Sequence, residues 1–415
     1  MKVGIVYDDR FASETDMRFP ERGNPGVGGT QYCVGMLIRY LSMKQDSELT
    51  VYQFGNTLLP EGVKKEKVGS LEQCFEMGER TQLDVLIVTH ALLPQSCLAQ
   101  IATSLKLIVW VHNYLSYEQT ELFSRCPAVK RVVFVSRQLY DIYLDHAICK
   151  KADYIFNMYQ NPSEKGFRGA EYGPVVTYLG NIAFVKGFHI LARQWSRILK
   201  QVPEAQLYVI GNGKLYDKQE KLGSYGIAEE KYEKEFVKYL IDEKGNFLPS
   251  VHFCGLMGQE KYEIFEKTAV GVMPSIEPET FGLSAVEMEA YGIPVVVRGK
   301  RGLLDISSDK KTGYQFRNDR ELARAVVKLL KNRQLNRKLG NGAKKLVEDK
   351  FAPSAITAQW CEVINDVSKG MPAKYHKPEN YFLRQLKFVK IFNRQLRKLF
   401  PSWPSVMEWH HKMKS

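Results

Sequence analysis

Short apolar runs alternate with helix-like segments along almost the whole of this chain. The runs are rich in Val, Ile and Leu and lack the polar alternation of a strand with one face in water. Strands of this kind, separated by helices, are typical of parallel sheets covered on both faces. We therefore predict an α/β fold with two doubly wound parallel sheets, one in each half. The predicted strands are 3–7, 49–54, 85–89, 107–111, 131–135, 154–157, 175–179, 206–210, 251–254, 270–273 and 295–297.

A chain of 415 residues is longer than the domains that usually form around one hydrophobic core, so more than one domain is expected. A polar, glycine-containing stretch at 161–173 separates the two halves and is predicted to be a linker. We predict Rossmann-like domains at 1–165 and 175–368, followed by a basic extension at 369–415. Because doubly wound domains bind ligands at the carboxyl ends of their strands, we expect the domains to face each other across a ligand-binding cleft.

The seven cysteines are scattered, and none forms a C-x-x-C pair. This pattern argues against a disulfide framework and a structural zinc site, and it indicates a reducing compartment. The first residues predict a strand rather than a signal peptide, and no stretch is long and apolar enough for a spanning helix. We expect a cytoplasmic protein, or a peripheral one on the cytoplasmic face of a membrane.

The segment 279–287, E-T-F-G-L-S-A-V-E, places two carboxylates around a predicted helix start. The amides of Phe281, Gly282 and Leu283 would carry the positive end of the helix dipole, which favours phosphate. The carboxylates of Glu279 and Glu287 only accept hydrogen bonds, which suits sugar hydroxyls. A helix start of this kind therefore suits a ligand with both a phosphate and a sugar. The alternative interpretation gives these residues no ligand: Glu279 only caps the helix, and Glu287 is a solvated surface residue.

Two further features lie at predicted strand ends. A long polar loop after the first strand ends in Gly26-Val27-Gly28-Gly29-Thr30, where glycine permits close approach to a diphosphate. The dinucleotide fingerprint does not fit, because the loop is too long and Gln31 occupies the third glycine position; a simple flexible turn is the alternative. His112 ends the run 107–112, where this fold usually binds ligands, although such a histidine is often structural.

These features resemble a known family, the retaining GT-B glycosyltransferases of family four (glycosyltransferase group 1). The segment 279–287 is similar to its Glu-x7-Glu motif, and the resemblance extends over roughly residues 2–368. The stretch 177–188, T-Y-L-G-N-I-A-F-V-K-G-F, resembles the family's Gly-Arg and Lys-Gly elements. Lys186 matches, but Asn181 stands where the family usually has Arg, so Lys186 would carry more of the leaving-group charge.

The resemblance implies an acceptor-binding first domain and a second domain that binds a nucleotide-sugar donor. It implies that Glu279, His112 and Lys186 are catalytic. The implied donor contacts are Gly28, Gly29, Asn181, Lys186, Gly211, Phe281, Gly282, Leu283 and Glu287. The implied activity is hexosyl transfer, with retention, to a glycan or lipid-linked acceptor in the biosynthesis of a cell-surface polysaccharide such as lipopolysaccharide. The alternatives are a sugar phosphorylase or epimerase of the same fold, and a catalytically silent binding module.

The chain contains no Asp-x-Asp element, the usual holder of a metal in the other major glycosyltransferase fold. We therefore expect no metal and no cofactor besides the donor, with the diphosphate charge met by Lys186 and helix N-termini.

The C-terminal residues 371–415 carry ten Lys or Arg and two Glu, a net charge of 10 − 2 = +8. Residues 382–400 predict a helix with an apolar stripe, formed by Phe382, Leu386, Val389, Phe392, Leu396 and Phe400, opposite a basic side. Such a helix suits an anionic membrane surface. The alternative is that the stripe packs onto the N-terminal domain. Nucleic acid is not expected as a partner, since no binding motif accompanies the charge.

Overall fold

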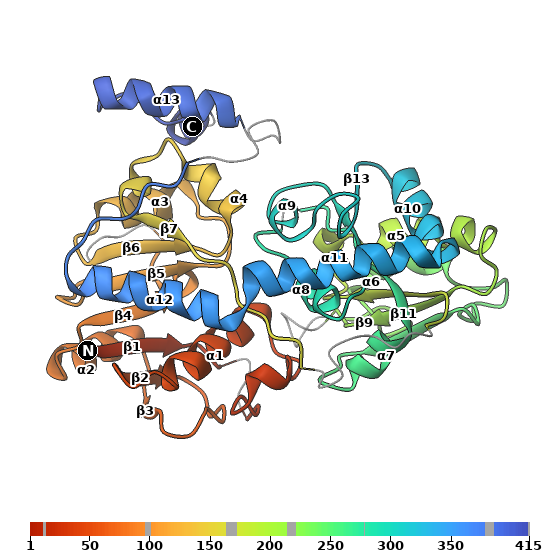
Figure 1. Cartoon of the computed structure of the whole chain (residues 1–415), viewed down its shortest axis with the longest axis horizontal. Helices are drawn as coiled ribbons and strands as arrows, with labels where there is room; N and C mark the ends of the chain where they lie inside the picture. Colours follow the sequence, from red (N-terminus) through yellow and green to blue (C-terminus); the bar gives the residue numbers. More distant parts are fainter. Residues whose placement is uncertain are drawn as a thin grey trace. The chain divides into compact units, whose positions relative to one another are not determined.

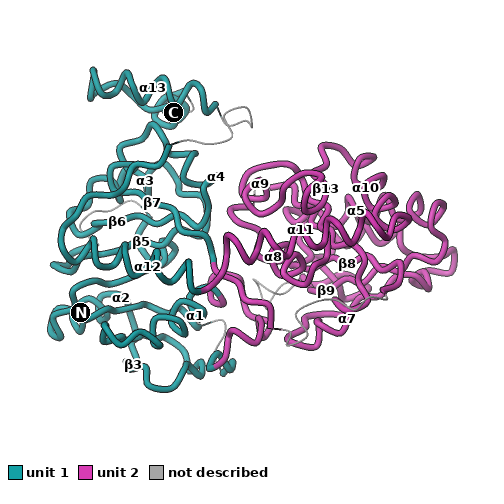
Figure 2. Tube along the Cα trace, viewed as in Figure 1, with its two compact units in different colours: residues 1–18, 33–157, 354–415 teal, residues 19–32, 158–353 magenta. Residues whose placement is uncertain are grey.

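The computed structural model describes residues 1–10, 14–95, 101–162, 172–213, 221–277, 279–377 and 386–413 (Figure 1). The chain forms two compact units that interleave along the sequence (Figure 2). Unit 1 comprises residues 1–18, 33–157 and 354–415, and unit 2 comprises residues 19–32 and 158–353. Relative to the predicted domains, residues 19–32 and 158–162 lie in unit 2, whereas residues 354–368 and the predicted extension lie in unit 1. The chain therefore passes from one unit to the other four times.

Unit 1 is built on a parallel sheet of seven strands in the order β3-β2-β1-β4-β5-β6-β7. Its strands are β1 (Lys2–Tyr7), β2 (Glu48–Gln53), β3 (Lys64–Lys67), β4 (Val85–Thr89), β5 (Leu107–Val111), β6 (Val129–Phe134) and β7 (Ala152–Tyr154). The strand order runs outward in both directions from β1 and β4, which is the doubly wound arrangement.

Helices complete unit 1 from both ends of the chain (Figure 1). They are α1 (Gly29–Ser42), α2 (Leu71–Arg80), α3 (Tyr117–Arg125), α4 (Arg137–Tyr140), α12 (Pro353–Ser368), α13 (Lys387–Leu399) and α14 (Val406–Lys412). Helix α12 belongs here because its buried Trp360 packs edge-on against Trp110 of β5, with 4.8 Å between ring centroids. Ser136 caps α4 by accepting a hydrogen bond from the Leu139 amide.

Unit 2 contains a second parallel sheet of six strands, in the order β10-β9-β8-β11-β12-β13. Its strands are β8 (Val175–Leu179), β9 (Gln206–Ile210), β10 (Val251–Gly255), β11 (Thr268–Met273), β12 (Val295–Arg298) and β13 (Gly313–Phe316). Its helices are α5 (Phe188–Leu199), α6 (Glu230–Phe236), α7 (Lys261–Lys267), α8 (Leu283–Ala290), α9 (Leu303–Ile306), α10 (Asp319–Lys331) and α11 (Arg333–Phe351). The partly buried Phe253 packs against the core of this unit.

The α/β fold with two parallel, doubly wound sheets is confirmed. The strand prediction missed β3 and β13, placed the start of β6 two residues late, and placed β7 at 154–157 instead of Ala152–Tyr154. Of the predicted linker 161–173, residues 163–171 lie outside the described residues. The six described cysteines carry no disulfide, and Cys97 lies outside the described residues.

Within the described ranges, no helix has both the length and the apolar character needed to cross a bilayer.

Candidate functional site

A sharp turn in unit 2 leads from β11 to helix α8. Gly282 precedes the helix with φ 102°, and its carbonyl accepts hydrogen bonds from the amides of Ala285 (3.0 Å) and Val286 (3.3 Å). A side chain on Gly282 would meet Leu303, since its Cβ would lie 2.7 Å from Leu303 Cδ2. Phe281 is buried edge-on against Phe351, at 5.3 Å. The turn thus holds the first amides of α8, the predicted phosphate donors, at a defined strand end.

Glu279 lies in this turn and is paired with Lys186. The Lys186 ammonium donates to Glu279 Oε1 at 2.6 Å, and the Ser275 hydroxyl donates to the same oxygen at 2.9 Å. The two charged side chains are 26% and 15% exposed, so the pair is partly screened from water while remaining accessible. The structure therefore brings together two of the three predicted catalytic residues. Ser275 was not singled out from the sequence.

The contact between two loops explains this pairing. Lys186 ends a short 3-10 turn, and the next residue, Gly187, has φ 72° and is the N-cap of α5. A side chain on Gly187 would collide with the carbonyl of Pro274, which follows β11. The amide of Ile276 also donates to the Val185 carbonyl at 2.9 Å. The loops after β8 and β11, two neighbouring strands, are thereby locked together.

Asn181 and Gly211 mark the ends of β8 and β9. Gly211 has φ 134°, and a side chain on it would collide with the Gly180 carbonyl. Asn181 is buried, and its backbone carbonyl accepts a hydrogen bond from the Tyr178 hydroxyl at 2.9 Å. Its side-chain oxygen is buried without a hydrogen-bond partner within the described ranges. An unsatisfied buried amide oxygen is costly and is commonly satisfied by a water or a ligand.

Glu287 is neither solvated nor exposed. Its Oε1 lies 3.0 Å from the ammonium of Lys261 and accepts a hydrogen bond from the Tyr262 hydroxyl at 2.9 Å. Both partners lie on α7, and both charged groups are buried. The alternative of a surface-exposed Glu287 is therefore wrong. Burial and the Glu287 charge raise the pKa of Tyr262, which keeps its hydroxyl protonated as the donor.

The glycine loop belongs to the same unit as these residues. Asn24 Oδ1 accepts hydrogen bonds from the Gly26 and Val27 amides, both at 2.9 Å, and the Asn24 carbonyl accepts one from Lys261 at 2.9 Å. Gly29 begins α1, and a Cβ on it would lie 3.8 Å from Leu283 Cδ2.

Gly28 lies one residue earlier, and its carbonyl accepts the Tyr32 amide at 3.0 Å. The predicted loop residues Gly28 and Gly29 therefore lie next to the start of α8.

His112 follows β5 and belongs to unit 1. It is buried, and its ring packs against Trp110 with 4.5 Å between centroids. Burial, with a smaller contribution from His90, lowers the pKa of His112 to about 3. The imidazole is therefore neutral at physiological pH, so it can exchange hydrogen bonds with a hydroxyl without bringing charge.

A cationic turn after β12 was missed in the sequence. The Gly302 amide donates to the Glu279 carbonyl at 2.9 Å, and a side chain on Gly302 would collide with the Thr280 carbonyl. The preceding residues are Lys300 and Arg301, and Arg301 adopts φ 56°. The sequence did contain a signal for this turn, because Lys300 and Arg301 stand between two glycines directly after an apolar strand.

Three comparisons agree with this architecture. Residues 163–346 match the family model described as glycosyl transferases group 1. An uncharacterized glycosyltransferase of Haemophilus influenzae is 21% identical over 332 residues, which cover 76% of this chain and 85% of that protein. Poly(glycerol-phosphate) alpha-glucosyltransferase of Bacillus subtilis is 24% identical over 257 residues, covering 61% of this chain and 32% of that enzyme. Anabaena Alr3699/HepE, solved in complex with UDP-glucose, superposes with a TM-score of 0.64 at 18% identity and covers 88% of this chain and 100% of that one.

The two parallel sheets and these likenesses define a glycosyltransferase of the GT-B fold. More particularly, the chain is similar to the glycosyl transferases of group 1 over residues 163–346. Its assignment to family four within that group stays a prediction.

Proposed function

We propose that the chain is a retaining, metal-independent hexosyltransferase. It would move a sugar from a nucleotide sugar to a glycan or lipid-linked acceptor during the synthesis of a cell-surface polysaccharide, lipopolysaccharide among the candidates. The observation that carries the proposal is the contact of Lys186 with Glu279 beside the first turn of α8. A cation, a hydroxyl acceptor and a helix N-terminus together offer complementary groups to the diphosphate and the sugar of one donor.

Lys186 and the first amides of α8 would bind the diphosphate. Donor binding then replaces the carboxylate partner of Lys186 by phosphate oxygens, and Glu279 Oε1 becomes available to the sugar hydroxyls. Stabilisation of the leaving diphosphate would rest on Lys186, because Asn181 brings no charge. The turn at Lys300 and Arg301, joined to the Glu279 backbone, is our candidate for the missing second cation. With these cations, the reaction would need no metal.

Retention would follow from front-face displacement. The acceptor hydroxyl attacks the anomeric carbon on the side from which the nucleoside diphosphate leaves, and its proton passes to the departing phosphate oxygen. One C–O bond breaks and another forms on the same face. Positive charge develops on the sugar, and the neutral His112 would hold a hydroxyl without opposing that charge. Glu287 would bind the ribose through Oε2, since Oε1 already interacts with Lys261 and Tyr262.

We further propose that the enzyme acts at the cytoplasmic face of a membrane, through its C-terminal segment. A lipid-linked acceptor would be concentrated at that surface.

The proposal is tested first by the thermal stability of the full chain with a panel of nucleotide sugars, because bound ligand raises stability by mass action. Transfer from the stabilising donor to oligosaccharide and lipid-linked acceptors is then assayed with and without EDTA, and NMR gives the anomeric configuration of the product. Glu279→Gln should abolish transfer. Glu277→Gln, an exposed residue of the same loop, is the matched control and should not affect it.

Inverted product, or transfer lost with EDTA and restored by a divalent cation, would contradict the mechanism. Donor binding without transfer to any acceptor would favour a silent module, the alternative that Asn181 supports. Turnover that requires inorganic phosphate would indicate a phosphorylase. Isomerisation of the donor when no acceptor is present would indicate an epimerase.

A further inference from the structure

The C-terminal helix α13 turns its polar side, not its apolar side, toward unit 1. Its buried residues are Lys387, Lys390 and Asn393, spaced three apart along one face. Lys387 Nζ lies 2.7 Å from the buried Asp141 carboxylate. Lys390 donates to the Ile142 carbonyl at 2.8 Å, and Asn393 donates to Asp145 Oδ2 at 2.7 Å. The alternative that the apolar stripe packs onto unit 1 is therefore wrong for the described residues.

Helix α14 is held to the same surface by polar contacts. The Val406 amide donates to Asp145 at 2.7 Å, and Arg397 pairs with Glu408 at 2.9 Å. The ring of His411 stacks on Tyr117 of α3, with 4.1 Å between centroids. We call residues 386–413 the C-terminal module.

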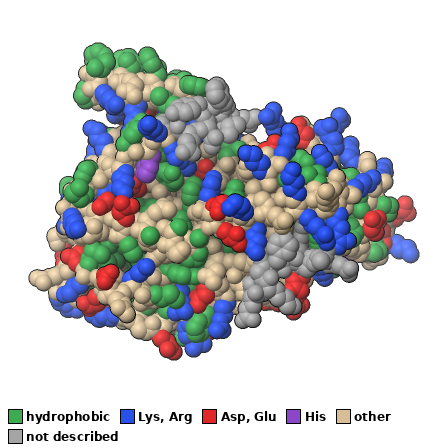
Figure 3. Space-filling model, viewed as in Figure 1, with side chains coloured by type: hydrophobic (Ala, Val, Ile, Leu, Met, Phe, Trp, Pro, Cys, Tyr) green, Lys and Arg blue, Asp and Glu red, His purple; other side chains and the backbone are tan. Residues whose placement is uncertain are grey.

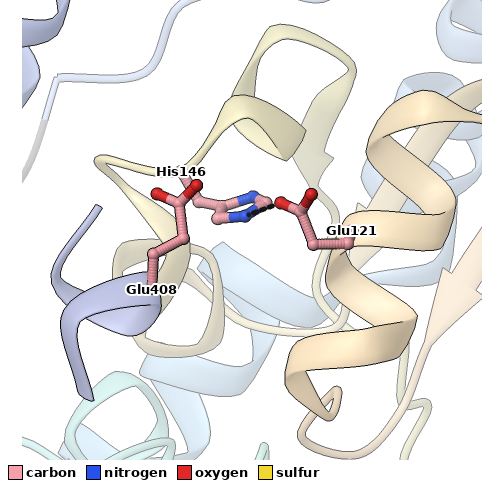
Figure 4. A group of neighbouring side chains, drawn as sticks. All are labelled: Glu121, His146 and Glu408. Atoms are coloured by element: carbon pink, nitrogen blue, oxygen red, sulfur yellow. Dashed lines mark hydrogen bonds and ion pairs between the residues drawn. The ribbon is translucent and has the colours of Figure 1, made fainter. Parts of the chain in front are cut away.

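Glu121 of α3, His146 and Glu408 of the module lie close together (Figure 4). The composition of this cluster resembles a metal site, but the hydrogen bonds assign the imidazole another role. His146 Nδ1 accepts the Ile148 amide at 3.2 Å, so in the neutral ring Nε2 carries the proton. That Nε2 lies 2.8 Å from Glu121 Oε1 and donates to it, and it has no lone pair left for a metal. The hydrogen bond joins His146 to α3, and the Glu408 carboxylate of the module lies within 4.8 Å of both residues.

The opposite face of the module is apolar and open to solvent. Its large hydrophobic side chains are between 40% and 76% exposed. They are Leu386, Phe388, Val389, Phe392, Leu399, Phe400, Trp403, Trp409 and Met413. Hydrophobic side chains cluster over α13 in Figure 3. The five aromatic residues alone expose about 500 Å², taking 150–250 Å² for a whole aromatic side chain. This is as large as the largest patch on a typical soluble monomer.

The charge of the segment selects the partner. Residues 371–415 carry a net +8, out of +13 for the whole chain. Within the module, Lys387 and Lys390 are buried against unit 1, and the other charged residues leave 4 − 1 = +3; they are Arg394, Arg397, Lys398, Lys412 and Glu408. A second copy would bring the same positive charge, which opposes self-association. An anionic bilayer offers the opposite charge together with an apolar interior, and the neighbouring Trp403 and Trp409 suit its interface, where tryptophan is enriched.

We infer that the apolar face of the C-terminal module docks on the surface of an anionic phospholipid bilayer, while its lysine face is anchored in unit 1. Residues 382–385 of the predicted helix lie outside the described residues and are not part of this inference. The inference deepens the proposed membrane association and rests on it, but it does not depend on the transfer reaction.

The test is flotation of the full chain with vesicles of phosphatidylcholine, either pure or with about one-third phosphatidylglycerol. We expect binding to the anionic vesicles that weakens as salt is raised. Phe388→Ser/Phe392→Ser should lower the partition coefficient roughly 100-fold, from the apolar area removed. Met43→Ser/Tyr239→Ser, which alters exposed apolar residues outside the module, should not change it. Neither double variant should change the melting temperature by more than a few degrees, because the altered side chains face solvent.

Equal binding to both kinds of vesicle would overturn the anionic preference, and binding to neither would overturn the docking surface. A concentration-dependent dimer in sedimentation velocity that Phe388→Ser/Phe392→Ser abolishes would assign the face to a second copy instead. The vesicle assay needs no donor, so its outcome is separate from that of the transfer assay.

Discussion

The ion pair between Lys387 and Asp141 should decide whether the C-terminal module stays attached. Both side chains are 0% exposed, and the charged atoms lie 2.7 Å apart. At an effective dielectric constant of about 20, this distance gives an attraction of roughly 6 kcal/mol, part of which offsets the desolvation of the two charges. Lys387→Met removes one partner and leaves Asp141 buried. The expected cost is about 3–5 kcal/mol in the docking of the module.

Hydrogen exchange of the α13 amides under native conditions measures that docking free energy. Protection should fall by roughly two to three and a half orders of magnitude, while the sheet amides of unit 1 keep theirs. Burial raises the pKa of Asp141 and Lys387 lowers it again, so the orphaned carboxyl takes up a proton more readily. The loss of docking free energy caused by Lys387→Met should therefore become smaller as the pH is lowered.

Two controls make the experiment decisive. Asp141→Asn/Lys387→Met removes both charges and should recover most of the protection. Lys398→Met changes an exposed residue of the same helix and should alter the docking free energy by less than about 0.5 kcal/mol. If Lys387→Met exchanges as slowly as the native chain, the buried pair does not hold the module and the reasoning is refuted.

Three further outcomes are expected. Lys186→Met should lower kcat about 10²- to 10³-fold in the transfer assay with a smaller change in KM, and Lys186→Arg should retain more activity. Gly211→Ala should lower the free energy of unfolding of unit 2, measured in urea, by more than about 2 kcal/mol. The reason is that φ 134° is strained for alanine and the new Cβ collides with a carbonyl. Gly226→Ala, at φ 70° with open space around the new Cβ, should cost less. Burial lowers the pKa of His90 to about 4 and of His112 to about 3, so the unfolded chain binds more protons below pH 6.5. Stability should fall by roughly 2 kcal/mol per histidine from pH 8 to pH 5, and less steeply in His90→Asn/His112→Asn.

Strand prediction succeeded where the signal is local. The segments 85–89, 107–111 and 175–179 are continuous apolar runs, and the structure forms β4, β5 and β8 over those residues. Strand β3 reads Lys-Lys-Glu-Lys and has no apolar signal; it is a sheet edge formed by pairing with β2. Pairing between distant segments cannot be recognised from either segment alone.

The same limit applies to the site. Motifs identified Lys186 and Glu279 separately, but their contact depends on two loops that lie far apart in sequence. The burial of Glu287 by Lys261 was likewise not predictable, since no periodicity links them. The apolar stripe of α13 was recognised, yet its direction was not: Asp141 attracts Lys387 inward and reverses the usual orientation of an amphipathic helix.

The interleaving of the two units affects how the chain folds as it leaves the ribosome. The sheet of unit 1 is complete at residue 157, but α12, which covers Trp110 with Trp360, begins only at Pro353. At about 5–20 residues per second, the intervening residues 158–353 take roughly 10–40 s to synthesise. During that time the newly made sheet lacks the helix α12 that covers Trp110, so this face is open to chaperones. A nascent chain truncated before α12 should therefore aggregate.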